Sequence, residues 1–204
     1  MSARINRSFD FQAGVRFSDD FYMNLYEVDI DFMVDSESIR EQNIALERIK
    51  YFLNECLENC IFIQDTETDA IEKYVEANMK VCVLPEEPYD QIIGIMLMVK
   101  LNAITEDRLS ITDLSICSKL SDGVSCLHSY EENTGPFKMQ GWWNDSNTKI
   151  SNLLSNSKSK KILKLVKPPI DWEDVYLGWK EKQEIVKNTP SAEIVFGVFD
   201  NKNK

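Results

Sequence analysis

Apolar and polar residues alternate with a period of two between residues 21 and 34. Aromatic and β-branched residues such as Tyr26, Val28 and Ile30 fill one set of positions, while acidic residues fill much of the other. This alternation is typical of a strand that buries one face and leaves the other in water. The stretch therefore predicts a long, half-buried β-strand with an acidic outer face.

The spacing of apolar residues then changes to three and four positions, which predicts an amphipathic helix over about 37–58. A second, shorter helix is predicted over about 65–78, and a third over about 89–104. The third is apolar on nearly every side, so we expect it to be buried on most of its surface. Between these helices, short apolar runs at 61–63 and 81–84 predict buried strands.

A β-rich stretch at 109–116 is followed by Asp122-Gly123, a pair that favours the tight turn of a hairpin. The resulting order is strand, helix, strand, helix, strand, helix, strand, strand. With an acidic, solvated face on the first strand, this order predicts an α+β protein with a ferredoxin-like, split β-α-β sheet and its helices on one face. A small α/β protein with a parallel sheet is the alternative.

The length of 204 residues suits one domain with an appendage. We expect residues 1–16 to form an N-terminal extension, 17–130 the α+β core, and 131–204 a C-terminal arm. The arm is predicted to contain a basic Ser/Lys/Asn segment at 146–167, an amphipathic helix at 171–187 and a final strand at about 192–199.

The charge of the chain is divided unevenly. The 34 acidic and 23 basic residues give a net charge of −11, which argues against a protein that binds nucleic acid or anionic membranes over its whole surface. The basic segment 146–167 nevertheless carries +6, and the other 182 residues carry −17. This asymmetry favours a segment that lies across the chain's own acidic body or links it to another subunit.

All four tryptophans lie in the last third of the chain. Trp172 and Trp179 are seven positions apart, so on a helix they share a face and anchor the arm to the core. Trp142 and Trp143 are adjacent and on a strand would face opposite ways, so one of them is expected to contact a partner. The predicted partner-binding residues are Trp142, Trp143, Lys158, Lys160, Lys161, Lys164, Trp172 and Trp179.

The acidic face of the first predicted strand supports a second hypothesis, in which carboxylates hold Mg²⁺ or Mn²⁺ for an enzyme acting on nucleotides or nucleic acid. Basic residues that would hold a triphosphate are scarce nearby, since 19–48 contains only Arg40 and Arg48. The candidate metal ligands are Glu27, Asp29, Asp31 and Asp113. A third hypothesis is a regulator that binds nucleic acid through the basic segment, without sequence specificity because that segment has no arginine.

The motifs GxxxxGK[ST], GxGxxG and GxSxG are absent from the sequence, which disfavours ATPase, dinucleotide-binding and α/β-hydrolase functions. The five cysteines form no CxxC pair, and no secretory signal or apolar run of membrane-spanning length is present. We therefore expect a cytoplasmic, non-enzymatic protein that needs no cofactor and works in protein interaction or assembly, most simply as a homo-oligomer. Accessory or structural proteins of phages and other viruses share this character, and in that case the protein would reside in a virion.

Overall fold

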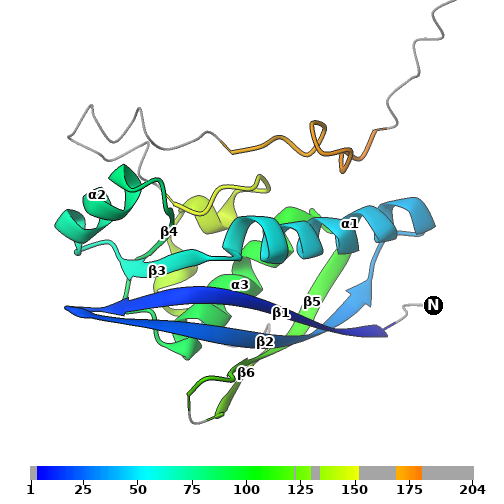
Figure 1. Ribbon diagram of the computed structural model, residues 1–204. Coiled ribbons are helices and arrows are strands. Elements are labelled where there is room, and N and C mark those ends of the chain that lie inside the picture. The colour runs from blue at the N-terminus through cyan, green and yellow to red at the C-terminus, as the bar shows by residue number, and fades with distance from the viewer. Residues whose placement is uncertain (1–3, 122, 130–133, 152–168, 181–204) are drawn as a thin grey trace, which may run out of the picture.

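A mixed, six-stranded β-sheet with helices packed on it forms the body of the protein in a computed structural model (Figure 1). The structure describes residues 4–121, 123–129, 134–151 and 169–180. The strands are β1 (Arg4–Phe17), β2 (Asp20–Val34), β3 (Cys60–Gln64), β4 (Lys80–Leu84), β5 (Leu109–Ser118) and β6 (Ser125–Ser129). The helices are α1 (Ile39–Tyr51), which continues as the π-helical η1 (Phe52–Leu57), α2 (Thr68–Glu76) and α3 (Asp90–Thr105), with 3-10 helices η2 (Gly135–Lys138) and η3 (Trp142–Asn144). The protein is thus α+β, as predicted.

The first strand corrects the expectation of an N-terminal extension over residues 1–16. β1 pairs with β2 in antiparallel register along its whole length, from Arg4 opposite Met33 to Phe17 opposite Asp20. Its apolar residues alternate and are buried where they face the helices, as with Phe11 and Val15. Arginines at positions 4, 7 and 16 interrupt the apolar appearance of this stretch, although its period of two is that of a strand.

The topology of the sheet differs from both predicted arrangements. The strand order is β4-β3-β1-β2-β5-β6, with β1, β3 and β4 parallel and with β1, β2, β5 and β6 joined by antiparallel pairing. A split β-α-β unit would need β2 and β3 to be parallel, but they run in opposite directions with β1 between them. The ferredoxin-like arrangement is therefore wrong, because β2 and β3 are antiparallel to each other. The parallel α/β alternative is wrong as well, because β2, β5 and β6 pair with their neighbours in antiparallel register.

The main core lies between the sheet and the helices α1 and α3, which cover the same face (Figure 1). α2 packs on the opposite face, mainly over β3 and β4, where Ile71 and Val75 meet Ile63 and Val83. The other strands expose that face, and no described helix covers it. It carries the acidic side of β2 that the alternation predicts.

The predicted helices over 37–58, 65–78 and 89–104 correspond to α1 with η1, α2 and α3. The strands predicted at 21–34, 61–63, 81–84 and 109–116, and the hairpin after the last of them, are likewise present. None of the described helices has the length and apolar character needed to cross a membrane.

The helix predicted over 171–187 is not formed where the structure describes it. Residues 172–176 form turns, Tyr176 has a left-handed backbone (φ 61°), and the Leu177 N–H donates to the carbonyl of Trp172 at 2.7 Å. Residues 181–187 and the predicted strand at 192–199 lie outside the described residues. The turns bring Trp172 and Trp179 onto one cluster of side chains, described below.

Candidate functional site

Trp142 and Trp143 pack inside the chain. Both lie on η3 and are buried, with 1% and 7% of their surface exposed. The Trp142 indole N–H donates to the carbonyl of Val83 at 2.9 Å, and that of Trp143 donates to the carbonyls of Phe137 and Met139, each at 3.1 Å. The expectation that only one of the pair faces inward is corrected, because a 3-10 helix turns about 120° per residue where a strand alternates by 180°.

The side chain of Arg48, on α1, joins the arm to the body. It is 2% exposed, and its guanidinium carbon lies 3.7 Å from the ring centre of Trp179 and 4.8 Å from that of Trp172. It donates hydrogen bonds to the carbonyls of Leu177 and Ile104 and forms an ion pair of 2.8 Å with Glu106. Burial lowers the pKa of Arg48, and the Glu106 carboxylate opposes that effect.

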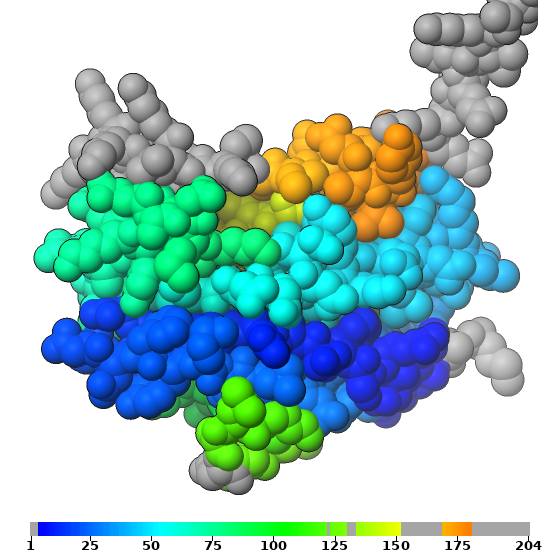
Figure 2. Space-filling model, in the orientation of Figure 1, coloured from blue at the N-terminus to red at the C-terminus, as the bar shows by residue number. Residues whose placement is uncertain are grey.

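Two more arginines complete this cluster, which we call the arginine cradle (Arg40, Arg48 and Arg108). The Arg108 guanidinium carbon lies 4.5 Å from the Trp179 ring centre, and Arg40 donates to the Trp179 carbonyl at 2.5 Å. Segment 169–180 rests over α1 in this way (Figure 2). This segment carries Asp171, Glu173 and Asp174, so an acidic, aromatic segment lies on basic residues of the body. The charge pattern had predicted a different contact, between the basic segment 146–167 and the acidic body.

The residues on either side of stretch 152–168 are bonded to each other, and Ile150 is bonded to the body. The Thr148 hydroxyl donates to the Ile170 carbonyl at 3.0 Å and accepts from the Ile170 N–H at 2.8 Å. Trp172 donates to the carbonyl of Ser146, and Ile150 accepts from the N–H of Val83 on β4. The predicted partner-binding residues Lys158, Lys160, Lys161 and Lys164 lie outside the described residues, within that stretch.

A buried amine lies beneath η3. Lys100, on α3, donates to the carbonyls of Trp142 at 3.0 Å and Asp145 at 2.7 Å, and its nitrogen lies 5.5 Å from the ring centres of Phe52 and Trp142. Burial lowers the pKa of this amine to about 7, although the Asp145 carboxylate opposes the effect. The contacts of Lys100 are structural, because both carbonyls belong to the turn that it holds.

The four carboxylates proposed as metal ligands lie on the exposed face of the sheet, and two of them are neighbours. Asp31 on β2 stands opposite Asp113 on β5, and the Arg4 guanidinium bonds to both, at 3.1 and 2.6 Å. Glu27 forms an ion pair with Lys119, and Asp29 accepts from the hydroxyl of Ser8. No group of three or more ligating side chains suited to a metal ion occurs among the described residues. A protein cation therefore lies between the two carboxylates that come together.

Aromatic side chains that the sequence pattern did not indicate surround the turn between β1 and β2, in one group on each face of the hairpin. We call the two groups together the aromatic tip, which consists of Phe17, Tyr22 and Tyr89 on one face and Phe21 and Tyr74 on the other. The ring of Phe17 lies 5.1 Å from that of Tyr89 and 6.4 Å from that of Tyr22, while the rings of Phe21 and Tyr74 are 6.4 Å apart. Because these residues come from β1, β2, α2 and the start of α3, no single stretch of sequence indicates the cluster.

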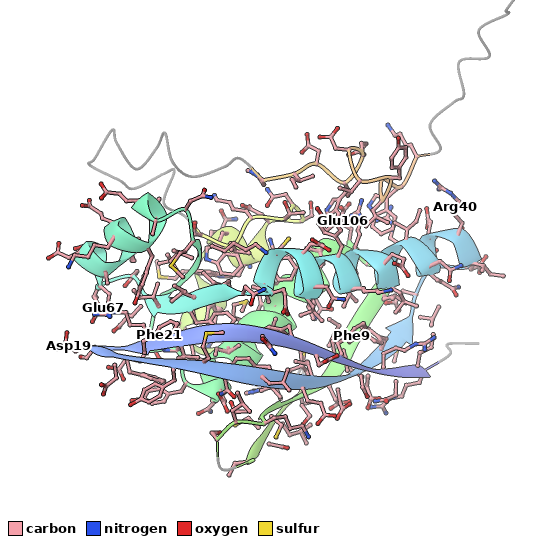
Figure 3. All side chains as sticks on the ribbon, viewed as in Figure 1. Phe9, Asp19, Phe21, Arg40, Glu67 and Glu106 are labelled. Carbon is pink, nitrogen blue, oxygen red and sulfur yellow. The ribbon has the colours of Figure 1, made fainter. Side chains whose placement is uncertain are left out.

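Acidic side chains border the aromatic tip. The carboxyl ends of the parallel strands β1, β3 and β4 meet at this edge, and the loops after them bring in Asp19, Glu67 and the pair Glu86 and Glu87. Figure 3 shows Asp19, Phe21 and Glu67 at this end of the molecule. Arg16 forms ion pairs with Asp19 at 3.8 Å and Glu67 at 3.5 Å. The carboxyl ends of parallel strands are common positions for binding sites.

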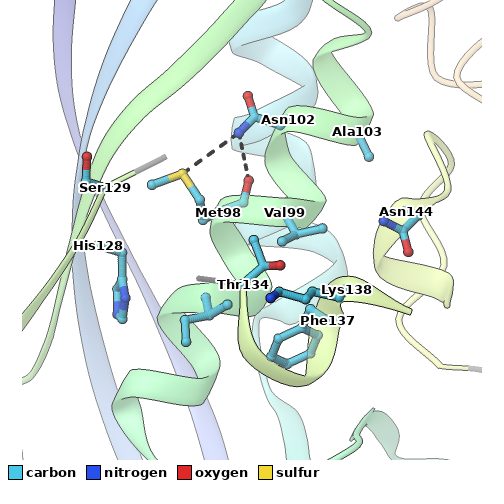
Figure 4. Close-up of a pocket in the computed structure, with 11 residues that line it drawn as sticks. Met98, Val99, Asn102, Ala103, His128, Ser129, Thr134, Phe137, Lys138 and Asn144 are labelled. Atoms are coloured by element: carbon cyan, nitrogen blue, oxygen red, sulfur yellow. Dashed lines mark hydrogen bonds between the residues drawn. The ribbon is translucent and has the colours of Figure 1, made fainter. Parts of the chain in front are cut away.

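A cavity of about 490 Å³ opens between α3, η2 and the end of β6 (Figure 4). Its wall is apolar at Val99 and Phe137, and its polar residues include Asn102 and Lys138. The Asn102 amide nitrogen donates to the Met98 carbonyl at 3.0 Å, and its oxygen accepts from the Ile111 N–H at 2.9 Å. The volume suits a small molecule, but this amide is already bound within the protein.

No protein-family model and no curated protein matches the chain. Among solved structures, an uncharacterized protein, WS1659, from Wolinella succinogenes is 13% identical with a TM-score of 0.46, over 64% of this chain and 99% of that one. A 6-pyruvoyl tetrahydropterin synthase from Plasmodium vivax is 10% identical with a TM-score of 0.40, over 63% of this chain and 99% of that one. These similarities leave the function of the protein open.

Proposed function

We propose that the protein is a non-enzymatic assembly protein that associates with a second copy of itself through the lysines of its basic segment. The observation that carries the proposal is that the residues on either side of stretch 152–168 are bonded to each other, through Thr148 and Ile170, next to the bond that Ile150 accepts from Val83 on β4. The stretch that carries the four lysines therefore begins and ends at a body with a large excess of acid.

The tryptophans of the arm contact their own body and leave the lysines to contact a partner. Trp142, Trp143 and Trp172 are buried in their own chain, and Trp179 stacks on the arginine cradle. These tryptophans hold the arm to its own body, so we assign partner contact to the lysines. A second copy supplies the complementary charge, since every copy carries both the basic segment and the acidic body.

The test is the molar mass of the full chain, measured by light scattering at low and high salt. We expect a mass above the 23.6 kDa of one chain at low salt, falling as salt screens the contact. A variant with Lys158, Lys160, Lys161 and Lys164 all changed to Gln should be a monomer at both salts. The matched control changes four exposed lysines of the body to Gln, namely Lys50, Lys73, Lys138 and Lys180.

If the control variant dissociates as readily as the basic-segment variant, net charge and not the segment governs association. A wild-type chain that is monomeric at low salt overturns the proposal directly. Absorbance at 260 nm, recorded on the same peak, shows whether bound nucleic acid accounts for any excess mass.

A further inference from the structure

Three aromatic side chains of the tip are unusually open to solvent. Phe21, Tyr22 and Tyr89 expose 42%, 54% and 57% of their surface, and Met23 beside them exposes 49%. Tyr22 and Tyr89 share one group of rings with Phe17, whereas Phe21 contacts Tyr74 on the opposite face of the β1–β2 hairpin. Exposed aromatic surface marks interaction sites, and tyrosine is enriched where partners bind. The cluster is also built into the fold, because the ring of Phe21 occupies the space over Gly14, where a Cβ would lie 2.6 Å from it.

The charge around the tip selects the kind of partner. The acidic residues around the rings are exposed, namely Asp19, Asp20, Glu86 and Glu87. Among the described residues, Arg16 forms ion pairs with this acidic border, with Asp19 and with Glu67. The guanidinium carbon of Arg16 lies 6.0 Å from the ring centre of Tyr74, so one ring of the tip already receives a cation on its face. An acidic border with aromatic rings at its centre suits lysine side chains, whose ammonium groups bind both carboxylates and ring faces.

From these features we infer that the aromatic tip of one copy receives the basic segment of a second copy, an inference that rests on the proposed self-association. The acidic face of β2 is the competing surface, but Arg4 and Lys119 already form ion pairs with its carboxylates. Among the described residues, no ion pair holds Asp20, Glu86 or Glu87 at the tip, and the exposed rings add the apolar area that a lasting contact requires.

The position of the basic segment favours a reciprocal, two-fold contact. Ile150, just before the undescribed stretch, is bonded to Val83 on β4, and Glu86 and Glu87 follow three and four residues after Val83. Ile150, the described residue that leads into the basic stretch, therefore lies on the same strand edge from which the loop with Glu86 and Glu87 continues. Two copies related by a two-fold axis then exchange the same contact twice, as an isologous interface requires.

The first test compares two double variants of the full chain by light scattering and analytical centrifugation at low salt. Tyr22→Ser with Tyr89→Ser should weaken association at least tenfold. Serine suits position 89, which is the N-cap of α3, so this change should leave the helix intact. The control is Leu120→Ser with Leu127→Ser, which removes apolar side chains exposed by 67% and 68% on the β5–β6 hairpin and should leave association unchanged.

Should the tyrosine variant unfold in thermal denaturation, Glu86→Gln with Glu87→Gln replaces it, with Glu47→Gln and Glu72→Gln as the control. If the basic-segment lysine variant is monomeric while both tip variants associate normally, the inference fails and the proposed function stands. If the lysine variant associates normally, the proposed function itself fails.

The second test separates contact between copies from contact within one copy. Equal amounts of ¹⁴N and ¹⁵N protein are mixed and treated with a carbodiimide, which joins lysine amines to carboxylates without a spacer. We expect peptides that link residues 158–167 to Glu86 or Glu87, with half of these links joining the two isotopes. Links confined to one isotope show that the segment docks on its own copy, and links to Asp29 or Asp31 assign it to the sheet face; either result overturns the inference.

Discussion

At the residue scale, the buried amine of Lys100 has a pKa close to neutral pH. It is wholly buried on α3, between η3 and the ring of Phe52, and its hydrogen bonds go to two backbone carbonyls. Such an amine is costly to bury charged, so its pKa falls to about 7 despite the nearby Asp145 carboxylate. In the sequence, this site is indicated only by a lysine within a helix whose other residues are mostly apolar.

The stability of the protein should therefore rise with pH just above neutrality. The unfolded lysine keeps its ordinary pKa near 10.5, so above about pH 7 the unfolded chain binds more protons than the folded one. By linkage, the free energy of unfolding rises by up to about 1.4 kcal/mol per pH unit in this range. Urea denaturation at several pH values between about 7 and 8.5 measures the slope.

The variant Lys100→Met should lose this slope, whereas Lys73→Met, which changes an exposed lysine, should keep it. The upper limit of the range is set by Cys56 and Tyr26, because burial raises the pKa of both groups and their titration lowers stability at higher pH. Equal slopes in the wild-type chain and in Lys100→Met would show that the amine does not control the dependence.

At the scale of elements, the packing of α3 on the sheet depends on a glycine. A Cβ at Gly94 would clash with the ring of His128 on β6 and lie 3.0 Å from the side chain of Ile116 on β5. Both neighbours are buried, so neither can move aside at low cost. The sequence indicates a buried helix here but not which strand it approaches this closely.

The variant Gly94→Ala should destabilise the protein by about 1–2 kcal/mol, because overpacking outweighs the gain of about 1 kcal/mol that alanine brings to a helix. In a double-mutant cycle with His128→Ala, the added methyl group should cost much less, since the ring that it meets is gone. Denaturation midpoints of the four proteins give the coupling. A stabilised single variant would mean that α3 does not lie this close to β6.

The elements themselves were predictable where hydrophobic periodicity is undiluted, as in β2, α1 and α3. In β1, Arg7 stands in the apolar set of alternating positions, and Arg4 and Arg16 add charge at both ends of the stretch, and this concealed the strand. The turn at Tyr176 could not be predicted from the seven-residue spacing of Trp172 and Trp179. A helix places two such residues on one face, but a turn can also bring both rings to the same side chain, here Arg48.

At the scale of the whole molecule, the arginine cradle joins segments that are far apart in the sequence. Arg48 contacts Ile104 and Glu106 at the end of α3 and, in the arm, Leu177 and both tryptophans of segment 169–180. A planar guanidinium can stack between rings and donate several hydrogen bonds at once, whereas an ammonium group cannot. The attachment of the arm therefore depends on an arginine at this position.

We expect Arg48→Met to lower the free energy of unfolding by about 2–4 kcal/mol, since it removes a buried cation from an ion pair, two ring faces and two carbonyls. Arg48→Lys should also release the arm, because it keeps the charge but loses the stacking. Tryptophan fluorescence and cleavage by protease within 169–180 report the release, and Arg7→Met, at an exposed arginine, is the control. An arm that stays protected in Arg48→Lys would show that charge alone holds it.

The sequence by itself determined the α+β class, most of the helices and strands, the acidic face of β2 and the uneven division of charge, because each of these depends on residues close together in the chain. Only the tertiary structure decided the strand order, the inward direction of both Trp142 and Trp143, the arginine cradle and the aromatic tip. These features join residues that are distant in sequence, and local periodicity does not record which surfaces meet. The uneven charge predicted a basic segment on an acidic body, and that prediction stays untested, because residues 152–168 lie outside the described residues. The docking of the acidic segment 169–180 on arginines was not predicted, because it depends on contacts between segments that are distant in sequence.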